Sequence, residues 1–546
     1  MMFSRNPLFY LLAVFGARAT STATASGPGS TLVNLGEFDY IVAGAGAAGL
    51  VAADRLSEAG KKVLLIERGP PSTYATGGRL GPAWLNGENL TRFDVPGLFN
   101  QIWVDSAGIR CDDIDQMAGC LLGGGTAVNS GLFFKPQSID WDYNFPAEPY
   151  DLITKVLSAV GYTSVTANDS PNKKNRTFAH TPFMYFNGER GGPLATYFET
   201  ARARSNLHIV LNTTVRRVIR KGGRITGVEV VATSSDGKTG LYSVTPNTGK
   251  VLLAAGAFGS PKILFRSGIG PRDQLEVVKA SATDGSTMID SSKWIKLPVG
   301  YNLQDHPSTD VVISHPSVKD YDFFAAFNNP IPADRDLYLN SRAGILATAA
   351  PGPNTMFWES LVPSDGIPRQ FQWTARAEGS INEKGDTLVT ASQYIGTGLK
   401  SRGRMTINSD LNMAVTTSPH LNDPYDIEAV IQSVQLFVDA LSADKSITIL
   451  HPAPGQSVAE YVNNYPGHRG TNHWIATCKM GTDDGTKGNG TTGSVVDTDT
   501  KVYGTDNLFV IDASIFPGQI TANPTASIMI AAEKAIENIL ALKHGY

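Results

Sequence analysis

The sequence predicts an α/β protein, and the prediction begins with a strand, a glycine-rich turn, a helix and a second strand near the N-terminus. The apolar runs 38–43 and 62–66 are rich in Ile, Val and Leu, as buried strands are, and a helix is expected over 50–56. The first run is followed by three glycines with the spacing G-x-G-x-x-G, which are Gly44, Gly46 and Gly49. This order of elements predicts a Rossmann-like βαβ unit that binds a dinucleotide.

Each residue of this unit has its own expected role. Gly44 permits the tight turn, Gly46 lets the backbone approach a pyrophosphate, and Gly49 lets the helix pack closely on the strand. The pyrophosphate would lie at the helix N-terminus, where free N–H groups and the helix dipole favour an anion. Glu67 ends the second strand and is expected to accept hydrogen bonds from a ribose.

The rest of the chain alternates between loops, strands and helices. Residues 71–140 are rich in Gly, Pro and Asn and are expected to be mainly loop, whereas 150–162 is expected to be a short amphipathic helix. Further strands are expected at 207–211, 215–219, 225–232, 250–255 and 507–511. Residues 311–470 hold strands separated by Pro and Gly and one long helix, Pro424–Leu441. We expect this region to form a sheet over an active site.

Two domains, neither contiguous in sequence, follow from this pattern. A Rossmann-like dinucleotide-binding domain is expected from 36–140, 205–310 and 490–546. An α+β domain for the substrate, built on an antiparallel sheet, is expected from 141–204 and 311–489. The predicted fold class is therefore α/β, with the two domains interleaved.

The N-terminal segment 1–25 has the pattern of a signal peptide. Arg5 precedes the apolar stretch 8–15, and two small-x-small cleavage sites follow. The stretch is too short to span a bilayer, which takes about 20 residues. We expect a secreted, extracellular protein without a membrane span, N-glycosylated at some of five sequons, which are Asn89, Asn168, Asn175, Asn212 and Asn489.

Composition argues against several other classes. The net charge of −4 is small and unclustered, so it gives no electrostatic footprint for nucleic acid. Three cysteines form no disulfide framework, and none has the spacing of a metal site. Cys111 and Cys120 can pair in an oxidising compartment, but Cys120 is expected to be a buried small residue instead. No role is assigned to Cys478.

Segments along nearly the whole chain resemble the glucose–methanol–choline (GMC) flavin oxidoreductases. These segments are GGGTAVN at 123–129, GAFGSPKIL running into SGIGP at 256–271, GYNLQDHP at 300–307, and those around His473 and Asn523. Within the family, 118–126 and 472–474 are most similar to the flavodehydrogenase domain of fungal cellobiose dehydrogenases. The resemblance implies FAD as the redox centre and oxidation of a hydroxyl group.

The resemblance also implies a set of site residues. FAD is expected to bind without a covalent link, because no His lies in the loop before Gly123. The implied cofactor-binding residues are Gly44, Gly46, Gly49, Glu67, Gly124, Asn129, Val215, Asp512 and Asn523. The implied substrate-binding residues are Arg376, Thr471 and Asn472, and the implied catalytic pair is His473 and Asn523.

The chemistry of an alcohol oxidation suits this pair. The hydroxyl proton must be removed while a hydride leaves the carbon for flavin N5, and neutral imidazole, with a pKa near ~6.5, suits the base role. Asn523 is expected to donate a hydrogen bond to the substrate oxygen. Because Pro524 follows it, Asn523 is also expected to be the N-cap of a helix over 525–533.

One departure from the relatives bears on the substrate. Only about 30 residues separate Asn129 from Tyr162, where cellobiose dehydrogenases have a longer segment that contributes to the sugar pocket. The expected substrate is therefore a sugar or another small alcohol, and the electron acceptor O₂, a quinone or a redox protein. Two alternatives stay open: a lyase acting on cyanohydrins without net redox, and a non-catalytic FAD-binding paralogue.

Overall fold

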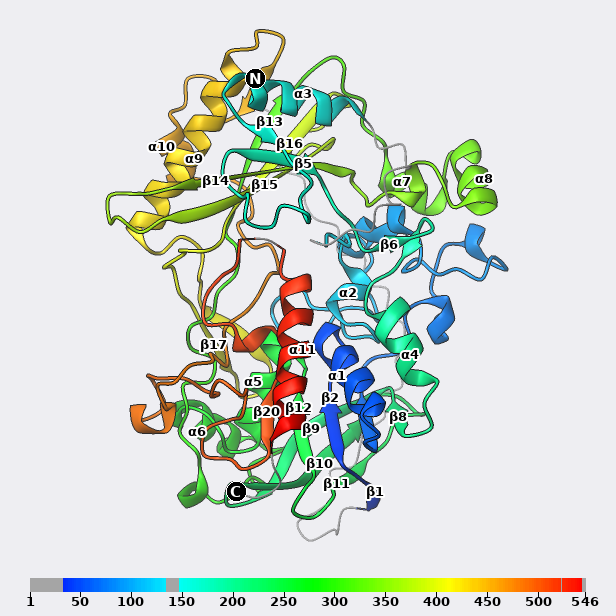
Figure 1. Cartoon of the computed structure of the whole chain (residues 1–546), viewed down its shortest axis with the longest axis vertical. Helices are drawn as coiled ribbons and strands as arrows, with labels where there is room; N and C mark the ends of the chain where they lie inside the picture. The colour runs from blue at the N-terminus through cyan, green and yellow to red at the C-terminus, as the bar shows by residue number, and fades with distance from the viewer. Residues whose placement is uncertain (1–32, 134–146, 522, 543–546) are drawn as a thin grey trace, which may run out of the picture.

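The computed structural model describes residues 33–133, 147–521 and 523–542. Figure 1 shows two parts, one above the other in that view. The lower part contains the glycine-rich unit and a parallel sheet, and the upper part contains a large, mainly antiparallel sheet covered by helices. The predicted fold class, including the antiparallel sheet, is confirmed.

The parallel sheet carries the glycine-rich unit. Its five strands lie in the order β20-β12-β2-β3-β8 and all pair in parallel. The strands are β2 (Tyr40–Ala43), β3 (Val63–Ile66), β8 (Leu207–Val210), β12 (Lys250–Leu253) and β20 (Leu508–Val510). Helices α1 (Ala47–Glu58) and α11 (Thr525–Ala541) pack on one face of the sheet. Most of the strand residues are buried because both faces are covered.

A four-stranded sheet covers the other face of the parallel sheet. It has the order β1-β11-β10-β9, with β1 (Asn34–Phe38), β11 (Gly240–Val244), β10 (Arg224–Ala232) and β9 (Thr213–Lys221). Its apolar side chains share one core with α5 (Gly256–Arg266), α6 (Arg272–Ala280) and alternate residues of the parallel strands. The expected strands of this region, including those in β8, β9, β10, β12 and β20, are therefore found where predicted.

The upper sheet has seven strands in the order β19-β13-β16-β15-β14-β5-β4. The strands are β19 (Thr448–His451), β13 (Ser308–Ser314), β16 (Leu388–Ile395), β15 (Arg369–Arg376), β14 (Pro353–Leu361), β5 (Thr177–His180) and β4 (Thr163–Ser164). All neighbours pair antiparallel except β4 with β5. One face packs its apolar side chains against α3 (Ala147–Ala159), α9 (Pro424–Ser442) and α10 (Val458–Asn463).

Shorter elements connect the two parts. Between 71 and 133 the chain forms only α2 (Gly125–Val128) and 3₁₀ turns at Tyr74–Thr76, Ala83–Leu85 and Pro96–Trp103, as the loop prediction requires. The remaining short elements are β6 (Tyr185–Phe186), β7 (Glu189–Arg190), α4 (Glu199–Arg202), α7 (Phe323–Asn328), α8 (Pro332–Ser341), β17 (Arg404–Ile407) and β18 (Met413–Thr417), with a π-helical turn at Leu194–Phe198 and 3₁₀ turns at Ser291–Lys293, Ile345–Ala347, Gly485–Gly488 and Ala513–Ile515.

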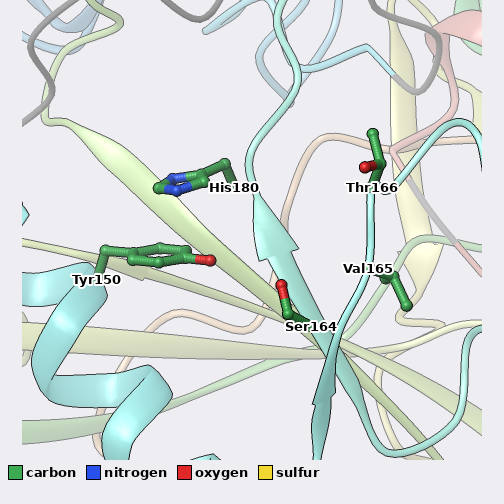
Figure 2. A pocket seen from close by; sticks show the side chains of 5 residues that line it. All are labelled: Tyr150, Ser164, Val165, Thr166 and His180. Carbon is green, nitrogen blue, oxygen red and sulfur yellow. The ribbon is translucent and has the colours of Figure 1, made fainter.

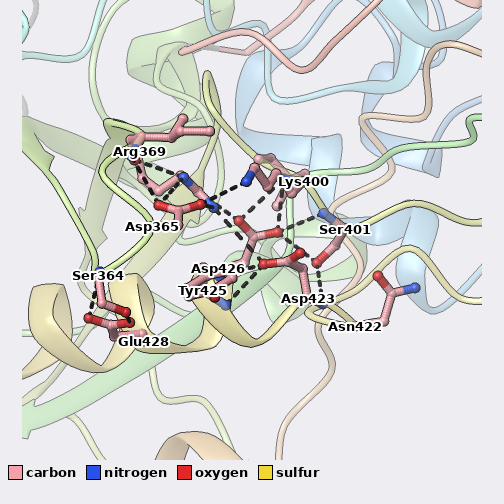
Figure 3. A network of polar contacts seen from close by, with 12 residues as sticks. Ser364, Asp365, Arg369, Lys400, Ser401, Asn422, Asp423, Tyr425, Asp426 and Glu428 are labelled. Atoms are coloured by element: carbon pink, nitrogen blue, oxygen red, sulfur yellow. Dashed lines mark hydrogen bonds and ion pairs between the residues drawn. The ribbon is translucent and has the colours of Figure 1, made fainter.

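An ion-pair network fixes the start of α9 to the upper sheet (Figure 3). The Asp426 carboxylate accepts from Arg369 Nε at 2.8 Å and from the Ser401 backbone N–H at 2.6 Å. Asp365 pairs with the same Arg369 at 3.0 Å and with Lys400 at 2.9 Å. The side chains of Arg369 and Asp426 are fully buried, so each charge depends on the other for compensation.

A disulfide joins Cys111 to Cys120, with the two Cα atoms 5.1 Å apart. The prediction of Cys120 as a buried, unpaired residue is therefore wrong. The backbone brings the pair together: Cys111 N–H donates to Ala118 and Cys120 N–H donates to Ile109, which makes an antiparallel turn of the intervening segment. The disulfide precedes Gly123 by three residues and closes the loop that leads into α2.

Candidate functional site

The glycine-rich turn has the geometry of a phosphate cradle. Gly44 has a φ of +107°, and a Cβ there would lie 2.5 Å from the carbonyl oxygen of Ala254, the residue that follows β12. A Cβ on Gly49 would lie 1.9 Å from the Gly44 carbonyl oxygen. A Cβ on Gly46, in contrast, would meet nothing within 4 Å, and Gly46 directly precedes α1. The turn is therefore tight against β12 but open in front of the helix N-terminus.

The loop around Gly124 lies against this turn. A Cβ on Gly124, which has a φ of +51°, would lie 3.0 Å from the Gly46 Cα, and Gly123 N–H donates to the Ala45 carbonyl at 2.9 Å. A Cβ on Gly125, the first residue of α2, would meet nothing within 4 Å. Two glycine-rich segments far apart in sequence thus lie against each other beside the N-terminus of α1, and Gly46 and Gly125 each leave open space where a Cβ would lie.

Glu67 lies at the carboxyl end of β3, directly beside the turn. Its two carboxylate oxygens accept from Ala45 N–H and Gly69 N–H, both at 2.9 Å. Burial raises the pKa of this carboxyl despite the two backbone donors. Each oxygen keeps a second lone pair, so the carboxylate can hold the turn and still accept from a ribose hydroxyl.

Asp512 follows β20 and organises the second glycine-containing segment. Its buried carboxylate accepts from Gly256 N–H at 2.9 Å and from the Ser260 hydroxyl at 2.5 Å, which ties the start of α5 to β20. Asn129 ends α2, accepts from Arg190 at 3.2 Å and lies 3.5 Å from the Thr525 hydroxyl of α11. Val215 is a buried core residue of β9.

His473 and Asn523, 50 residues apart in sequence, are in direct contact. Asn523 Nδ2 lies 3.1 Å from His473 Nε2, and Gln372 Nε2 of β15 donates to Asn523 Oδ1 at 2.8 Å. The other ring nitrogen, His473 Nδ1, lies 3.0 Å from Nδ1 of His306. Burial, together with the neighbouring His306 imidazole, lowers the pKa of His473 to about 3 against the opposing charge of Asp305.

Asp305 positions the loop that carries His473. Its fully buried carboxylate accepts from the backbone N–H groups of Thr471 at 2.9 Å and His473 at 2.8 Å, from the Thr471 hydroxyl at 2.8 Å, and lies 3.1 Å from His420 Nε2. Burial alone would raise the pKa of Asp305, but the His420 and His473 imidazoles and the Thr471 hydroxyl hold it below its usual value. The carboxylate therefore fixes the backbone on which the imidazole is mounted.

Asn523 is not a helix cap, contrary to prediction. Helix α11 begins at Thr525, its N-cap position is Pro524, and no side chain accepts from the first turn. Pro524 has helical dihedrals (φ −78°, ψ −12°), but the Asn523 side chain accepts from Gln372 and not from a backbone N–H of the first turn. The amide of Asn523 is instead shared between Gln372 and His473.

The structure places the three predicted substrate residues at different points around the pair. The backbone N–H and the hydroxyl of Thr471 both donate to Asp305. Asn472, which has a φ of +60°, accepts a hydrogen bond from Trp474 Nε1 at 3.3 Å on its side-chain oxygen. Arg376 is at the end of β15, where it donates to Glu378 and Ser392. Burial lowers the pKa of this guanidinium, but the nearby carboxylates outweigh it and raise the pKa.

The seven-stranded sheet presents a polar face toward His473 and Asn523. Strand register puts the following side chains on that face: Ser308, Asp310, Gln372, Thr374, Arg376, Ser392 and Tyr394. Gln372 reaches Asn523, and the Tyr394 ring lies 5.9 Å from the His473 ring. A sheet with one apolar face on helices and one polar, largely buried face matches the prediction of a roof over the site.

Three residues of this site were not predicted as such. Asp305 and His306 lie within the GYNLQDHP segment, whose charged and aromatic residues could have indicated a functional role. Gln372 carried no sequence signal, because a glutamine in an apolar strand reads as a surface residue until the partner across the sheet is known. The described residues hold no cluster of His, Cys, Asp or Glu that could bind a metal ion.

A separate cavity of about 400 Å³ lies at the edge of the upper sheet (Figure 2). It is lined by Tyr150, Ser164, Val165, Thr166 and His180, with the Tyr150 and His180 rings stacked. His180 pairs across the sheet with Thr355, whose side chain alternates away from the Gln372 face. This cavity is therefore distinct from the catalytic pair.

Sequence comparison identifies models for most of the chain. A GMC oxidoreductase model matches residues 145–308 and a second one matches 400–532, so that together they span more than half of the chain. An FAD binding domain model matches 39–92, which contains the glycine-rich turn. None of the helices in the described ranges is both long and apolar enough to cross a membrane.

Curated relatives match over nearly full length. A dehydrogenase of Emericella nidulans is 24% identical, with 94% of each chain covered. The oxygen-dependent choline dehydrogenase of Xanthomonas campestris is 26% identical, with 92% of this chain and 95% of the relative covered. The likeness to cellobiose dehydrogenases stays a prediction from motifs.

Solved structures share the fold. Pyridoxine 4-oxidase from Mesorbium loti superposes with a TM-score of 0.69 at 19% identity, covering 93% of this chain and all of that one. A formate oxidase superposes with a TM-score of 0.70 at 18% identity, covering 94% and 99%. With the glycine-rich turn and the matched models in agreement, the chain belongs to the GMC oxidoreductase family and is an FAD-dependent oxidoreductase, with dehydrogenase and oxidase homologues that act on CH–OH groups.

Proposed function

We propose that this enzyme oxidises a hydroxyl group of a sugar or another small polar alcohol to a carbonyl, with His473 as the base. The observation that carries the proposal is the contact between His473 and Asn523 beneath the polar face of the seven-stranded sheet. Gln372 Oε1 is buried and has no hydrogen-bond partner among the described residues. An acceptor of this kind favours a substrate that carries hydroxyl donors.

The residues divide the work of the reaction. FAD, when bound, supplies the hydride acceptor. His473 is neutral at ordinary pH because its pKa is about 3, so an imidazole lone pair is available to take the hydroxyl proton. When His473 has taken the proton, its imidazolium is stabilised by the nearby charge of the Asp305 carboxylate. Asn523 holds its amide group beside the reacting nitrogen and orients the substrate oxygen.

The glycine cradle and its neighbours are proposed to hold FAD without a covalent link. Gly46 leaves room for the pyrophosphate, Gly124 lets its loop approach the Gly46 backbone closely, and Glu67 would accept from the ribose. Asn129, Val215, Asp512 and Asn523 are proposed as further cofactor-binding residues. We also propose that the chain is secreted and N-glycosylated, with O₂, a quinone or a redox protein as electron acceptor; the signal-peptide segment 1–25 lies outside the described residues.

Anaerobic flavin bleaching tests the proposal. The purified holoenzyme is mixed without oxygen with sugars, aryl alcohols and lactols in turn, and the absorbance of oxidised flavin is followed. At least one alcohol should bleach the flavin and yield the matching carbonyl compound. Intact flavin with every alcohol, together with cleavage of a cyanohydrin, would support the lyase instead. Intact flavin without any turnover would support the non-catalytic paralogue.

A further inference from the structure

Four hydrogen bonds form a continuous chain through the catalytic pair. It runs from Gln372 Nε2 to Asn523 Oδ1 at 2.8 Å, and from Asn523 Nδ2 to His473 Nε2 at 3.1 Å. It continues from His473 Nδ1 to His306 Nδ1 at 3.0 Å, and from His306 Nε2 to the Ile520 carbonyl oxygen at 2.7 Å. The chain begins on the polar face of the upper sheet and ends on the backbone just before α11.

The end at Ile520 sets the direction of every link. A carbonyl oxygen only accepts, so His306 Nε2 must carry the hydrogen. Burial lowers the pKa of His306, so this imidazole is neutral and its Nδ1 has a lone pair. His473 Nδ1 must then donate, which leaves the lone pair of His473 on Nε2. Asn523 therefore presents its NH₂ group to His473 and its oxygen to Gln372.

We propose that His306 and Gln372 are positioning residues that together fix the tautomer of His473, so that Nε2, to which Asn523 donates, is the ring nitrogen that carries the lone pair. This inference rests on the proposed role of His473 as the base. His306 sets the tautomer from one side by accepting from Nδ1, and Gln372 sets it from the other by holding the amide orientation of Asn523.

The direction of the hydrogen bonds must be set at both ends of the chain, because the imidazoles and the Asn523 amide within it can each be reversed. A neutral imidazole carries its proton on either nitrogen, and an amide can turn its oxygen or its NH₂ toward a partner. If Asn523 turned its oxygen toward His473, Nε2 would have to carry a proton and could not act as a base. The Ile520 carbonyl only accepts and so fixes the His306 end, and a reversed Asn523 would lose its hydrogen bond to Gln372 Nε2 unless the Gln372 amide reversed with it.

The charged and titratable groups around the chain act on it at a distance. Asp305 holds the backbone of the His473 loop, His420 pairs with Asp305, and Tyr394 lies beside both histidine rings. Arg376 is held by carboxylates at the end of β15. Among the described residues, the ring nitrogens of His473 form hydrogen bonds with His306, which accepts, and with Asn523, which donates, and with no other residue. The direction of the chain is therefore set by its own members.

Nitrogen NMR of the holoenzyme reads the tautomer without any substrate. The enzyme is produced with ¹⁵N-labelled histidine, and the His473 signals are assigned by difference from His473→Asn. In the wild type, Nδ1 should carry the proton and Nε2 should be unprotonated from pH 5 to 8. A protonated Nε2 in the resting enzyme would overturn the proposal.

Gln372→Glu reverses the chain by design. The protonated carboxylic acid donates to Asn523 as glutamine does, whereas the ionised carboxylate only accepts and draws the Asn523 NH₂ toward itself. We expect His473 Nε2 to become protonated and anaerobic flavin reduction to fall at least tenfold as the pH rises through the pKa of the introduced carboxyl. At lower pH the rate should recover. A rate and a tautomer that match the wild type across this range would contradict the proposal.

His306 offers a second, independent variant if Gln372→Glu fails to fold. His306→Asn keeps an oxygen acceptor near the position of Nδ1, whereas His306→Phe keeps a ring but offers no acceptor. His306→Asn should retain the wild-type tautomer of His473, and His306→Phe should lose it. The same tautomer in both variants would contradict the proposal. His315→Asn, on an exposed turn with Ser317, is the matched control and should change nothing.

The outcomes separate this inference from the proposed function. One outcome is that His473→Ala abolishes flavin reduction while Gln372→Glu and His306→Phe leave the His473 tautomer and the pH profile unchanged. In that case the proposed role of the hydrogen-bond chain is wrong, and the proposed role of His473 as the base is right. If the flavin of His473→Ala is reduced at the normal rate, the assignment of His473 as the base is wrong. The NMR measurement then still shows whether the hydrogen-bond chain fixes the His473 tautomer. FAD absorbance and the circular dichroism of each variant show that it is folded and loaded.

Discussion

At the scale of single residues, the low pKa of His473 determines the expected pH dependence. A base with a pKa of about 3 is already deprotonated throughout the range in which most proteins are stable. Flavin reduction by substrate should therefore show no acid limb from His473 between pH 5 and 8. An exposed histidine, with a pKa near ~6.5, would give such a limb.

Asn523→Asp should introduce the missing acid limb. It places a carboxylate where Nδ2 now lies, 3.1 Å from His473 Nε2, and so stabilises the imidazolium. The pKa of His473 should rise, and flavin reduction should be slow at low pH and recover as the pH rises. Anaerobic stopped-flow measurements from pH 5 to 8 check this. A variant with the flat profile of the wild type would show that the amide does not act on the base.

At the scale of elements, the glycine-rich turn separates a packing role from a binding role. Gly49→Ala puts a Cβ 1.9 Å from the Gly44 carbonyl, so it should lower the melting temperature as well as FAD content. Gly46→Val adds its side chain where no protein atom lies within 4 Å of the Cβ, so the protein should fold but purify without FAD. Full FAD occupancy in Gly46→Val would place the pyrophosphate elsewhere.

The anchor of α9 makes a prediction about stability. Asp426→Asn removes one of the two carboxylates that pair with buried Arg369, while Asp365 remains, and should cost ~1.5–3 kcal/mol of unfolding free energy, as losing hydrogen bonds to a charged group does. Asp439→Asn, an exposed position on the same helix, is the control and should change stability by less than ~0.5 kcal/mol. Urea unfolding compares the two. Equal stabilities would mean that the network contributes nothing.

At the scale of the whole molecule, FAD is expected to be held by contacts alone. The purified protein should be yellow, and acid or heat should release the flavin into the supernatant, because no histidine lies in the loop before Gly123. Absorbance of the supernatant after precipitation measures this. Colour that stays with the precipitated polypeptide would indicate a covalent link.

The sequence predicted the parts of the molecule whose signals are local. The strand–turn–helix unit around Gly46 and the helix α9 follow from periodicity and glycine spacing, and both lie where predicted. The helix expected over 150–162 instead spans Ala147–Ala159, because the chain turns at Gly161, where φ is +87°. Boundaries depend on such turns, which periodicity does not resolve.

Properties that depend on distant partners were harder to predict. Asn523 looks like a cap in sequence, but Gln372 and His473 occupy its amide in the fold. The pairing of Cys111 with Cys120 depends on a backbone turn that their spacing alone does not specify. His306 became meaningful only when the fold brought it beside His473.

The central claim is that His473 is the base, and His473→Ala tests it most directly. The variant should bind FAD normally, because no cofactor-cradle residue is changed, but anaerobic flavin reduction by the best alcohol should fall ~10²–10⁴-fold. Stopped-flow absorbance of oxidised flavin, at equal FAD occupancy and saturating substrate, is the measurement. Reduction at the wild-type rate would contradict the account.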